Sequence, residues 1–576
     1  MCECYLPEAS DDQVQVFGTS NGGNVTRTRR GPVAVALTGL LSTVLIGGAS
    51  ASASPGTTTG GDTPLTIAGN ATATPKYVDQ RTNPVQPADL RPVPAPLGID
   101  GRAAGASLPT TSITGTKPSA SDTARMPGGP NTGVPAAGPG LRAQPDAPVP
   151  TTVNENFDGI NQAGGGGAQP SDINASVGPT QILETVNRRV TVFTKGTNGV
   201  VQCTNTLAGF LGLGATNVFD PRTLYDNLND RFIIIATTNG TPGAAPRLFL
   251  AASVGGNACG GYFVYTLTFT GGLFPLGTLL DYPILGQDRV SILASTNNFN
   301  PGYINSSAWL VAKALVYAGA AVAFPVFAVA FSTAPVTVTG IPIGNTINTF
   351  WIAGRPGFGY NLYRHPTAGG AIVLQAAIAS AYAAPPRRVI QCGTAVTLDP
   401  LDGRVAWAPV QAVNSPFIWF THGNNIAGFP GVRYGAIDTT TNVVTAALAF
   451  HSGTSDDFNP SLAAFETAPN AFYIWLNWAY TQNPPPACNF TSTTVDGVTP
   501  GAGVPNLIAT DLTLAAGVQT TTNTRFGDYS SVHLDPTAAS PTCPVGQTAL
   551  LAQQYFLGAG GPWATRLSRV SFGPGC

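Results

Sequence analysis

Charged side chains are scarce in this sequence of 576 residues: Asp, Glu, Lys and Arg together make up 10%. The 27 basic and 29 acidic residues nearly cancel. A basic stripe for nucleic acid is therefore missing, as is an acidic tail that would store cations. Only four of the basic residues are lysines, a bias more easily explained by genome composition than by function. No nucleic-acid partner is expected.

Motifs of common catalytic and metal sites are missing too. The four histidines show no H-E-x-x-H or other ligand spacing, and the cysteines form no C-x-x-C pair, so no zinc site is expected. Ser530 lacks the G-x-S-x-G turn of many serine hydrolases. Neither the S-x-D-x-G-x-T-W repeat of sialidase-type propellers nor the D-x-[DN]-x-[DN]-G calcium loop occurs. The sequence therefore carries no direct catalytic signature.

Residues 26–54 have the three parts of a secretory signal. Three arginines form a basic start, residues 32–46 are apolar, and residues 49–53 offer small side chains for cleavage. The apolar part is too short and too interrupted by glycine to span a membrane. We therefore expect a secreted or envelope-associated protein whose mature form has no integral membrane span.

The cysteines support export. Two of the eight, Cys2 and Cys4, precede the signal, and the remaining six form the even number that favours disulfides in an exported chain. These six are Cys203, Cys259, Cys392, Cys488, Cys543 and Cys576. Six cysteines allow fifteen pairings. Proximity in the sequence favours Cys203–Cys259 and Cys488–Cys543, which leaves Cys392–Cys576.

Composition divides the chain into three parts. Residues 1–53 hold an N-terminal extension and the signal. Residues 54–150 are rich in Pro, Gly, Ala, Ser and Thr and contain almost no aromatic residue. Such a segment buries too little apolar surface to offset the entropy of ordering, so a disordered linker is predicted, acting either as a stalk or as an inert or cleaved segment. Residues 151–576 are predicted to fold.

A hairpin-like phrase recurs through the folded part. A turn with Pro, Asp or Tyr leads a short apolar strand, Asn or Asp makes a tight turn, and a second β-rich strand follows. The copies start near residues 178, 220, 282, 409, 459 and 528. Helical periodicity is nearly absent. Because such a unit buries its face only against its neighbours, the repetition predicts an all-β fold, a single β-propeller.

The spacing of the phrase predicts the number of blades. The gap between positions 282 and 409 is about two units long and conceals a degenerate copy near residues 342–353. About seven blades result; six or eight also fit, since loops vary and one blade can be shared by both ends of the chain. Closure of the ring would remove the exposed sheet edges that favour aggregation.

A long, mostly apolar run covers residues 309–331. Lys313 and Pro325 interrupt it, and Gly319 marks a turn. Two strands of one blade, joined at Ala318 and Gly319, explain the run better than a membrane span does.

Short motifs follow one another in a fixed order. They are V-G-P at 177–179, D-P-x-x-x-Y-D at 220–226, D-Y-P-x-L-G at 281–286, N-P-S at 459–461, R-F-G-D-Y-S at 525–530, Asp535-Pro536 and W-A-T-R at 563–566. With them the chain resembles a family of exported bacterial β-propeller proteins, largely without assigned function. The resemblance covers about residues 154–572 and implies a propeller fold and export, but no catalytic residues. Residues 319–390 depart from the pattern, which leaves the fourth blade least well defined.

The densest polar cluster lies in the second copy of the phrase. It comprises Asp220, Tyr225, Asp226 and Arg231. A structural latch would pair Asp with Arg while Tyr packs between blades; gripping a ligand is the alternative. Further candidate ligand-binding residues are Arg525 and Tyr529.

Carboxylates also occur at or near the leading turns of several phrases. They are Asp281, Asp288, Asp457 and Asp528. If the first strands line the central channel, these groups can converge at one mouth. Asp281, Asp457 and Asp528 would then suit Ca²⁺, whereas Asp281, Asp288 and Asp528 are the candidates for acid/base catalysis. The alternative is that each Asp caps its own turn.

Aromatic residues offer ring faces for sugars, although half or more should form blade cores. The candidates are Trp419, Tyr473, Trp475, Trp478 and Trp563. Our first functional prediction is an exported, monomeric propeller that binds an extracellular polysaccharide or surface protein across one mouth of the ring. The alternatives are an extracellular hydrolase or lyase with an acidic channel site, and a structural envelope protein.

Overall fold

The computed structural model describes residues 63–81, 152–339, 349–366, 370–413, 415–482, 488–499, 508, 511–537, 543, 546–558 and 561–573. All of these residues belong to the unit Thr59–Cys576. Strands dominate them, and the all-β prediction is confirmed. Two short helices also occur there, α2 (Leu207–Phe210) and α3 (Lys313–Tyr317). The predicted signal lies outside the described residues, so export stays a prediction.

Three sheets hold four antiparallel strands each. The first comprises β5 (Asn174–Val177), β6 (Gln181–Val186), β7 (Arg189–Thr194) and β8 (Val201–Thr206). The second comprises β28 (Ser455–Ala468), β29 (Ala471–Gln482), β30 (Asn489–Val498) and β31 (Leu512–Gly517). The third comprises β32 (Ser531–Leu534), β33 (Thr548–Phe556), β34 (Trp563–Ser571) and β4 (Thr152–Asn161).

A ten-stranded sheet consists of two similar halves. One half comprises β9 (Val218–Asp226), β10 (Arg231–Thr238), β11 (Arg247–Ser253) and β12 (Gly261–Thr270). The other comprises β13 (Leu279–Gln287), β14 (Ser291–Phe299), β15 (Tyr303–Ala312) and β16 (Val322–Val329). Between them lies β2 (Ile67–Ala73), which pairs with both β12 and β16, while β3 (Pro75–Asp79) pairs with β12.

Two five-stranded sheets and one short hairpin complete the described part. One sheet comprises β17 (Ala334–Pro335), β19 (Thr349–Arg355), β20 (Gly359–His365), β21 (Val373–Ala379) and β1 (Thr63–Pro64). The other comprises β18 (Thr337–Thr339), β24 (Val410–Ala412), β25 (Phe417–Ile426), β26 (Phe429–Asp438) and β27 (Val443–Ala449). The hairpin pairs β22 (Val389–Ile390) with β23 (Thr397–Leu398).

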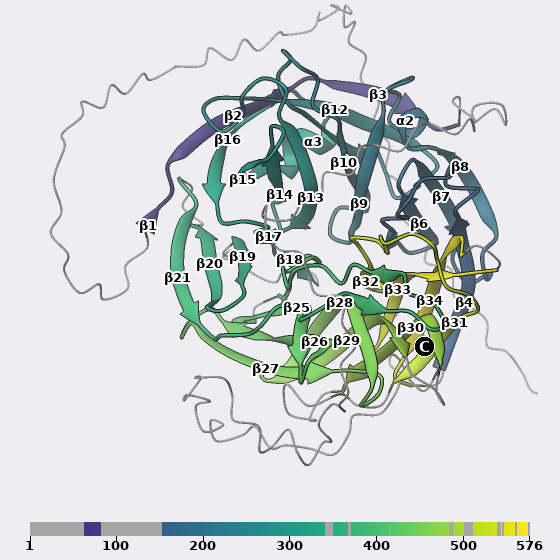
Figure 1. Ribbon diagram of the computed structural model, residues 1–576. Coiled ribbons are helices and arrows are strands. Elements are labelled where there is room, and N and C mark those ends of the chain that lie inside the picture. Colours follow the sequence, from purple (N-terminus) through teal and green to yellow (C-terminus); the bar gives the residue numbers. More distant parts are fainter. Residues whose placement is uncertain are drawn as a thin grey trace, which may run out of the picture. The chain divides into compact units, whose positions relative to one another are not determined.

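The sheets surround a central axis, and the first strand of each lies innermost (Figure 1). Neighbouring first strands contact one another, as β5 contacts β9, β9 contacts β13, and β32 contacts both β28 and β5. This arrangement is a β-propeller. The pairing of β34 with β4 closes the ring with strands from the two ends of the folded part. The predicted number of about seven blades stays a prediction.

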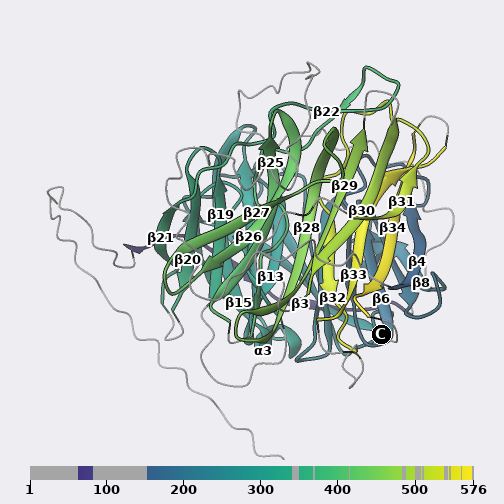
Figure 2. The ribbon, with the colours of Figure 1, turned by 90° about the horizontal axis from the view of Figure 1, so that it is seen from below.

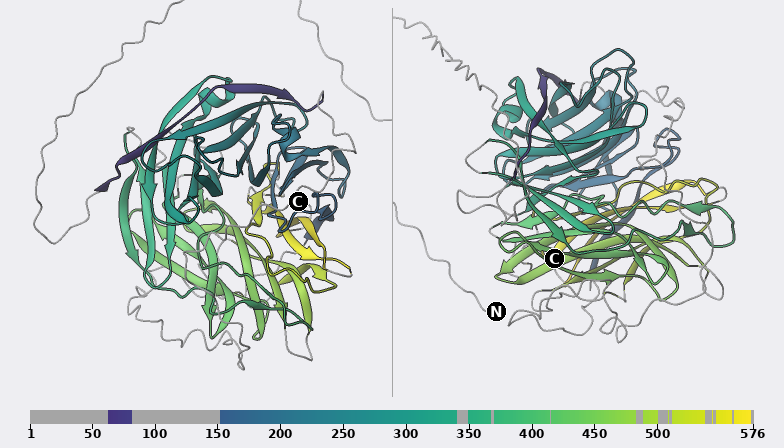
Figure 3. Two further views of the ribbon diagram at one scale, coloured as in Figure 1. Left: turned by 45° about the horizontal axis from the view of Figure 1, so that its top comes forward. Right: turned by 60° about the vertical axis from the view of Figure 1, so that its left-hand side comes forward.

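The prediction of a disordered linker over residues 54–150 is wrong for residues 63–79. This segment forms β1, β2 and β3, which pair with the outer strands β21, β12 and β16. Figure 3 shows β2 and β3 as a purple ribbon along the outside of the ring. The composition argument failed because the segment needs no core of its own: its backbone groups bond to sheet edges that other residues have already built. Of residues 54–150, only residues 63–81 are described.

The recurring phrase corresponds to a bulge at the start of an inner strand. Asp220, Tyr282 and Asn459 have φ values of 51°, 52° and 50°, and each precedes a proline. The strand register shifts at each of these points. Proline has no N–H for the ladder and is tolerated in a sheet at such bulges. Three copies of the phrase therefore mark the same local backbone feature, a bulge near the start of an inner strand.

The apolar run at residues 309–331 contains parts of two strands, as predicted, but residues 313–317 between them form α3 and not a strand. Strands β15 and β16 lie on either side of a turn in which Gly319 has φ 63°. Trp309 is fully buried and stacks on Phe324 at 4.9 Å between ring centres. Among the described residues, we found no helix with the length and apolar character needed to cross a membrane.

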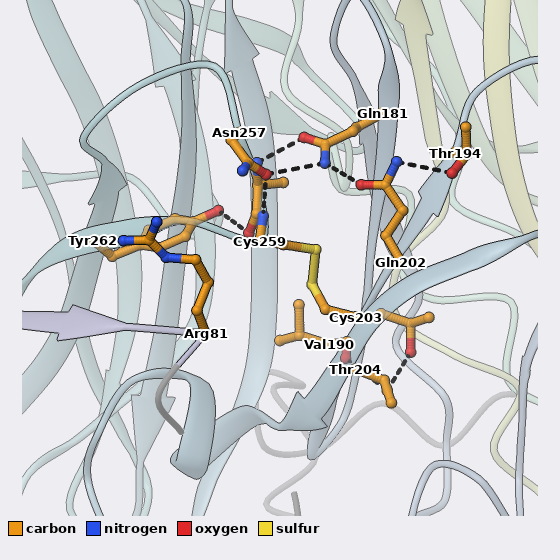
Figure 4. Close-up of a disulfide and its surroundings, with 12 residues drawn as sticks. Arg81, Gln181, Val190, Thr194, Gln202, Cys203, Thr204, Asn257, Cys259 and Tyr262 are labelled. Carbon is orange, nitrogen blue, oxygen red and sulfur yellow. Dashed lines mark hydrogen bonds between the residues drawn. A yellow bond between two sulfur atoms is a disulfide. The ribbon is translucent and has the colours of Figure 1, made fainter. Parts of the chain in front are cut away.

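Two disulfides join neighbouring parts of the ring. Cys203–Cys259 is present as predicted; it links β8 to the loop before β12, beside hydrogen bonds from Gln181 (Figure 4). The second bond is Cys392–Cys488, so the predicted pairs Cys488–Cys543 and Cys392–Cys576 are wrong. Proximity in the sequence misled us because the loop after β22 approaches the start of β30 across 96 positions. Cys543 is also disulfide-bonded, to a partner outside the described residues.

Candidate functional site

The inner strands form an axial channel whose two ends differ in chemistry. Figure 2 shows β22 and α3 at opposite ends of the ring. Strands β9 and β13 finish at the end where α3 lies, since Asp226 and Gln287 contact Lys313 there. Aspartates gather near the starts of these strands. A pocket opens near their ends.

Four carboxylates make up what we call the acidic end of the channel. They are Asp172, Asp220, Asp281 and Asp528, and they come from the inner segments of three sheets. Asp172, Asp220 and Asp281 are at most 8% exposed, whereas Asp528 is partly exposed. Asp281 lies close enough to Asp528, and Asp220 close enough to both, for their charges to repel one another.

Hydrogen bonds hold these carboxylates in place. Tyr529 Oη donates to Asp220 Oδ2 at 2.9 Å, and Arg525 Nη2 donates to Asp528 Oδ2 at 2.7 Å. The backbone N–H of Asp528 donates to Asp172 Oδ1 at 2.8 Å. Each carboxylate therefore has a defined orientation before any ligand arrives.

Burial and mutual repulsion set the charge state of the acidic end. Burial raises the pKa of Asp281 to about 7, and the Asp528 carboxylate adds to the shift. The pKa values of Asp172 and Asp220 lie well above their ordinary range for the same two reasons. Both effects disfavour the charged form of a carboxylate. The acidic end can thus hold protons near neutral pH.

Arg222 fills the centre of the channel below the acidic end. Its guanidinium lies over the Tyr529 ring, 3.3 Å from the centroid, and 5.6 Å from the centroid of Tyr282. Its Nε donates to the Pro283 carbonyl at 3.0 Å and its Nη2 to the Ala406 carbonyl at 3.1 Å. This stack separates the acidic end from the rest of the channel.

A pocket of about 280 Å³ opens at the other end of the channel. We call it the mouth pocket; its polar and aromatic lining includes Tyr225, Asp226, Asp288, Arg289, Lys313 and Phe465. The volume approaches the lower limit of typical ligand pockets. The ends of β9, β13 and β28 and the start of α3 supply these side chains.

The polar groups of the mouth pocket are held in a preformed network. Lys313 Nζ lies 2.8 Å from Asp226 Oδ2 and donates to Gln287 Oε1 at 2.9 Å. Burial lowers the pKa of Lys313, an effect that the neighbouring Asp226 opposes. Asp288 accepts hydrogen bonds from the backbone N–H groups of Val290 and Ser291. The pocket is thus organised without a ligand.

The predicted latch of Asp and Arg in the second phrase is wrong. Asp226 pairs with Lys313 of α3, and Arg231 donates instead to the carbonyls of Asn229 and Asp230. Tyr225 donates to Asp230 at 2.6 Å. Asp220 lies at the opposite end of β9. The cation that pairs with Asp226, Lys313, comes from a distant segment of the chain. The spacing of residues within the phrase could therefore not predict this pair.

The proposed calcium ligands do not form one set. Asp457 accepts hydrogen bonds from the His451 backbone N–H, Ser455 Oγ and Trp478 Nε1. Its partners therefore differ from those of Asp281 and Asp528. Within the described ranges, no group of three or more His, Cys, Asp or Glu side chains could hold a metal ion. Asp288, proposed with Asp281 and Asp528 for catalysis, belongs to the mouth pocket. Asp288 does cap its own turn, as the alternative predicted.

The tryptophans proposed to stack on sugars form blade cores. Trp419, Trp475, Trp478 and Trp563 are at most 2% exposed. Tyr473 is only partly buried and stacks on the Phe572 ring. Large flat side chains are the most effective filling between packed sheets, which explains their burial.

Sequence reasoning missed three central residues: Asp172, Arg222 and Lys313. Asp172 has φ 48° just before β5, so it occupies the same kind of position as Asp220, but its copy of the phrase was recognised only from Val177 onward. Arg222 stands within D-P-x-x-x-Y-D at a position that the motif leaves open. Lys313 was noticed only as an interruption of an apolar run. The available signal for Lys313 was that a charged residue interrupts an apolar run of the sequence.

No protein-family model and no curated protein matches the chain. Solved structures with a similar fold include a subtype N10 neuraminidase-like protein of A/little yellow-shouldered bat/Guatemala. It is 10% identical to this chain with a TM-score of 0.31, and the match covers 61% of this chain and 98% of that one. The phage phi92 endosialidase has 8% identity, 74% and 69% coverage, and a TM-score of 0.35. Polysaccharide lyase Uly1 has 10% identity, 75% and 100% coverage, and a TM-score of 0.34. Such likeness carries no argument about ligand or activity.

Proposed function

We propose that the protein binds a hydroxyl-rich polymer, an extracellular polysaccharide, in the mouth pocket. The observation that carries this proposal is a preformed pocket of about 280 Å³ at one end of the channel, lined by hydrogen-bonding groups and aromatic rings. A pocket of this size accepts one unit of a chain, and the rest of the polymer would extend over the face of the ring.

The chemistry of the lining favours a sugar over a protein surface. Tyr225 and Phe465 are half-buried and supply ring faces, while Gln287 and Arg289 supply hydrogen-bonding groups. Sugar units present both hydroxyls and apolar C–H faces, so a pocket with rings and polar groups suits them. A protein partner would instead require a broad, complementary surface.

The charges of the mouth pocket favour a neutral polymer. Its acidic residues Asp226, Asp288 and Asp535 are balanced by Lys313 and Arg289 in the lining and by Lys195, which lies 2.8 Å from Asp535. A polymer of uronic or sialic acids would meet no excess of positive charge there. Neutral glycans should therefore bind more tightly than acidic ones.

Titration calorimetry with a panel of neutral and acidic oligosaccharides tests this proposal. Arg289→Gln should weaken binding at least tenfold, since it removes a charged donor from the pocket. Arg355→Gln, a change on an exposed arginine of β19, is the matched control and should leave affinity unchanged. Absence of binding to every glycan, or equal affinity in the two variants, would reject the proposal.

A second candidate, a hydrolase or lyase, is favoured by the acidic end. Asp281 with a pKa of about 7 lies near Asp528, which is ion-paired with Arg525; two carboxylates in different environments can serve as acid and base. The candidate predicts product release from a polymer panel that Asp281→Asn and Asp528→Asn both abolish while thermal stability is retained. Activity that survives both changes would exclude it.

Three further features belong to this proposal. We assign one blade to each set of strands that begins with β5, β9, β13, β17, β24, β28 or β32, which gives seven. The two disulfides support export to an oxidising compartment. We expect a monomer, since ring closure leaves no inner edge for pairing; sedimentation velocity would test this.

A further inference from the structure

A second, smaller cavity lies on the channel axis between the acidic end and the mouth pocket. We call it the axial cavity; its volume is about 30 Å³, and its lining includes Asn174, Arg222, Thr337, Trp407 and His533. A cavity needs roughly 10–15 Å³ to hold one water-sized species, so this one has room for a single small ion or one or two waters. Leu224, Leu534 and other shared residues connect its lining with that of the mouth pocket, which provides a route of entry.

Three lining residues carry buried polar atoms that lack a hydrogen-bond partner. These atoms are Arg222 Nη1, Asn174 Nδ2 and His533 Nε2. Asn174 Oδ1 accepts from the Thr223 backbone N–H at 2.9 Å, which fixes the amide so that its Nδ2 remains as the free donor. Arg222 and Asn174 are 2% and 0% exposed. Unpaired buried polar atoms cost free energy, so three around one cavity indicate a missing ligand.

Two of the unpaired atoms, Arg222 Nη1 and Asn174 Nδ2, are donors, and the first belongs to a charged group. Arg222 donates to two carbonyls and lies over aromatic rings, and among the described residues it forms no ion pair. No Asp or Glu lines the axial cavity. His533 can present an N–H at Nε2, and burial, which lowers its pKa to about 4, keeps the ring neutral. A buried cation without a counterion is strongly disfavoured.

We propose that the axial cavity binds a monovalent anion of the size of chloride, held by Arg222, Asn174 and His533. Water would satisfy the donors but leave the guanidinium charge uncompensated. The anion would neutralise the centre of the ring, where inner strands from several sheets meet, and so stabilise the fold.

Crystals of the whole protein grown in sodium bromide provide the direct test. Bromide scatters anomalously, and we expect a peak within hydrogen-bond distance of Arg222 Nη1. A map that shows only water at this place, or no bromide peak there, overturns the proposal. This measurement uses the unaltered chain and needs no variant to fold.

Thermal unfolding in solution provides an independent test. At constant ionic strength, replacing gluconate by chloride should raise the Tm, because an ion that binds only the folded state stabilises it by mass action. Arg222→Gln should remove this dependence, whereas the control Arg355→Gln should retain it. Equal responses to chloride in the wild type and in Arg222→Gln would overturn the proposal. Neither test depends on polysaccharide binding.

Discussion

Tyr529 donates a hydrogen bond of 2.9 Å to the carboxylate of Asp220, which lies 309 positions earlier in the chain. The bond connects the segment before β32 with the bulge at the start of β9. The face of the Tyr529 ring lies against the Arg222 guanidinium. One side chain therefore links the acidic end to the centre of the propeller.

Tyr529→Phe removes only the hydroxyl of this link. We expect a loss of about 1 kcal/mol in the free energy of unfolding, the usual contribution of one hydrogen bond. The pKa of Asp220 should rise further, because the hydrogen bond from Tyr529 lowers it. Urea denaturation measures the first effect and carboxyl NMR titration the second. An unchanged Asp220 titration would show that the bond does not form in solution.

Asp281→Asn should change how stability depends on pH. The folded-state pKa of about 7 exceeds the ordinary value of 3.8, so the folded state binds more protons between these values. The free energy of unfolding therefore falls as pH rises through this window. The variant should show a smaller fall and be more stable than the wild type at pH 8, by up to a few kcal/mol at about 1.4 kcal/mol per pKa unit.

Asp438→Asn is the control of opposite sign. Hydrogen bonds from Thr440 and Thr441 lower the pKa of Asp438, so its contribution is present above the ordinary pKa and is lost as pH falls. This variant should be less stable than the wild type at pH 8. Chemical denaturation at a series of pH values compares the two, and parallel behaviour of both variants would contradict the proposed protonation of Asp281.

Lys313→Met should destabilise the protein strongly. The side chains of Lys313 and Asp226 are 5% and 2% exposed and form an ion pair of 2.8 Å. Removing one partner of a buried pair leaves an uncompensated charge and costs about 3–5 kcal/mol. The double variant with Asp226→Asn should recover most of this loss. Equal stabilities of the single and double variants, measured in guanidinium chloride, would show that the pair is not coupled.

Ala71→Asp tests the strand that runs along the outside of the ring. Ala71 is fully buried in β2, where it packs in one core with Phe269 and Phe324. A carboxylate there would be buried without a partner and should detach β2, which lowers the Tm and exposes residues 63–81 to proteases. Thr72→Asp, on the exposed side of the same strand, should leave both properties unchanged. Equal proteolysis of the two variants would argue against the pairing.

Replacing Cys203 and Cys259 together by Ala should also lower stability. The bond closes a loop of 56 positions, and loss of a disulfide typically costs about 2–4 kcal/mol. The hydrogen bonds of Gln181 to Asn257 and to the Ala258 N–H span the same junction and should hold the two sheets together in the variant. The denaturation midpoint should therefore fall without loss of the β spectrum in circular dichroism.

The inner strands were predictable because the phrase that marks them is a local backbone requirement. A residue with positive φ, followed by proline, is needed wherever a strand starts with this bulge, and it leaves the same trace at Asp220, Tyr282 and Asn459. The assumption that first strands line the channel led us to expect Asp281 near Asp528, but it also placed Asp288 and Asp457 beside them, where they do not lie.

The remaining parts of the site depend on contacts between distant segments. Lys313 reaches Asp226 across 87 positions (313 − 226), and Arg222 meets a carbonyl 184 positions away. Neither contact alters the local pattern of the sequence. The strands at residues 63–79 escaped prediction for a similar reason, since their pairing energy comes from edges built elsewhere.

The pairing of β4 with β34 has a consequence for synthesis. Strand β4 is translated first among the strands of residues 152–573, yet its partner is the last of them to emerge. Until residue 571 has left the ribosome, β4 has no partner strand and the first and last sheets cannot join. A chain released before Trp563 would stay an open arc, so nine residues, Trp563–Ser571, decide whether the ring closes.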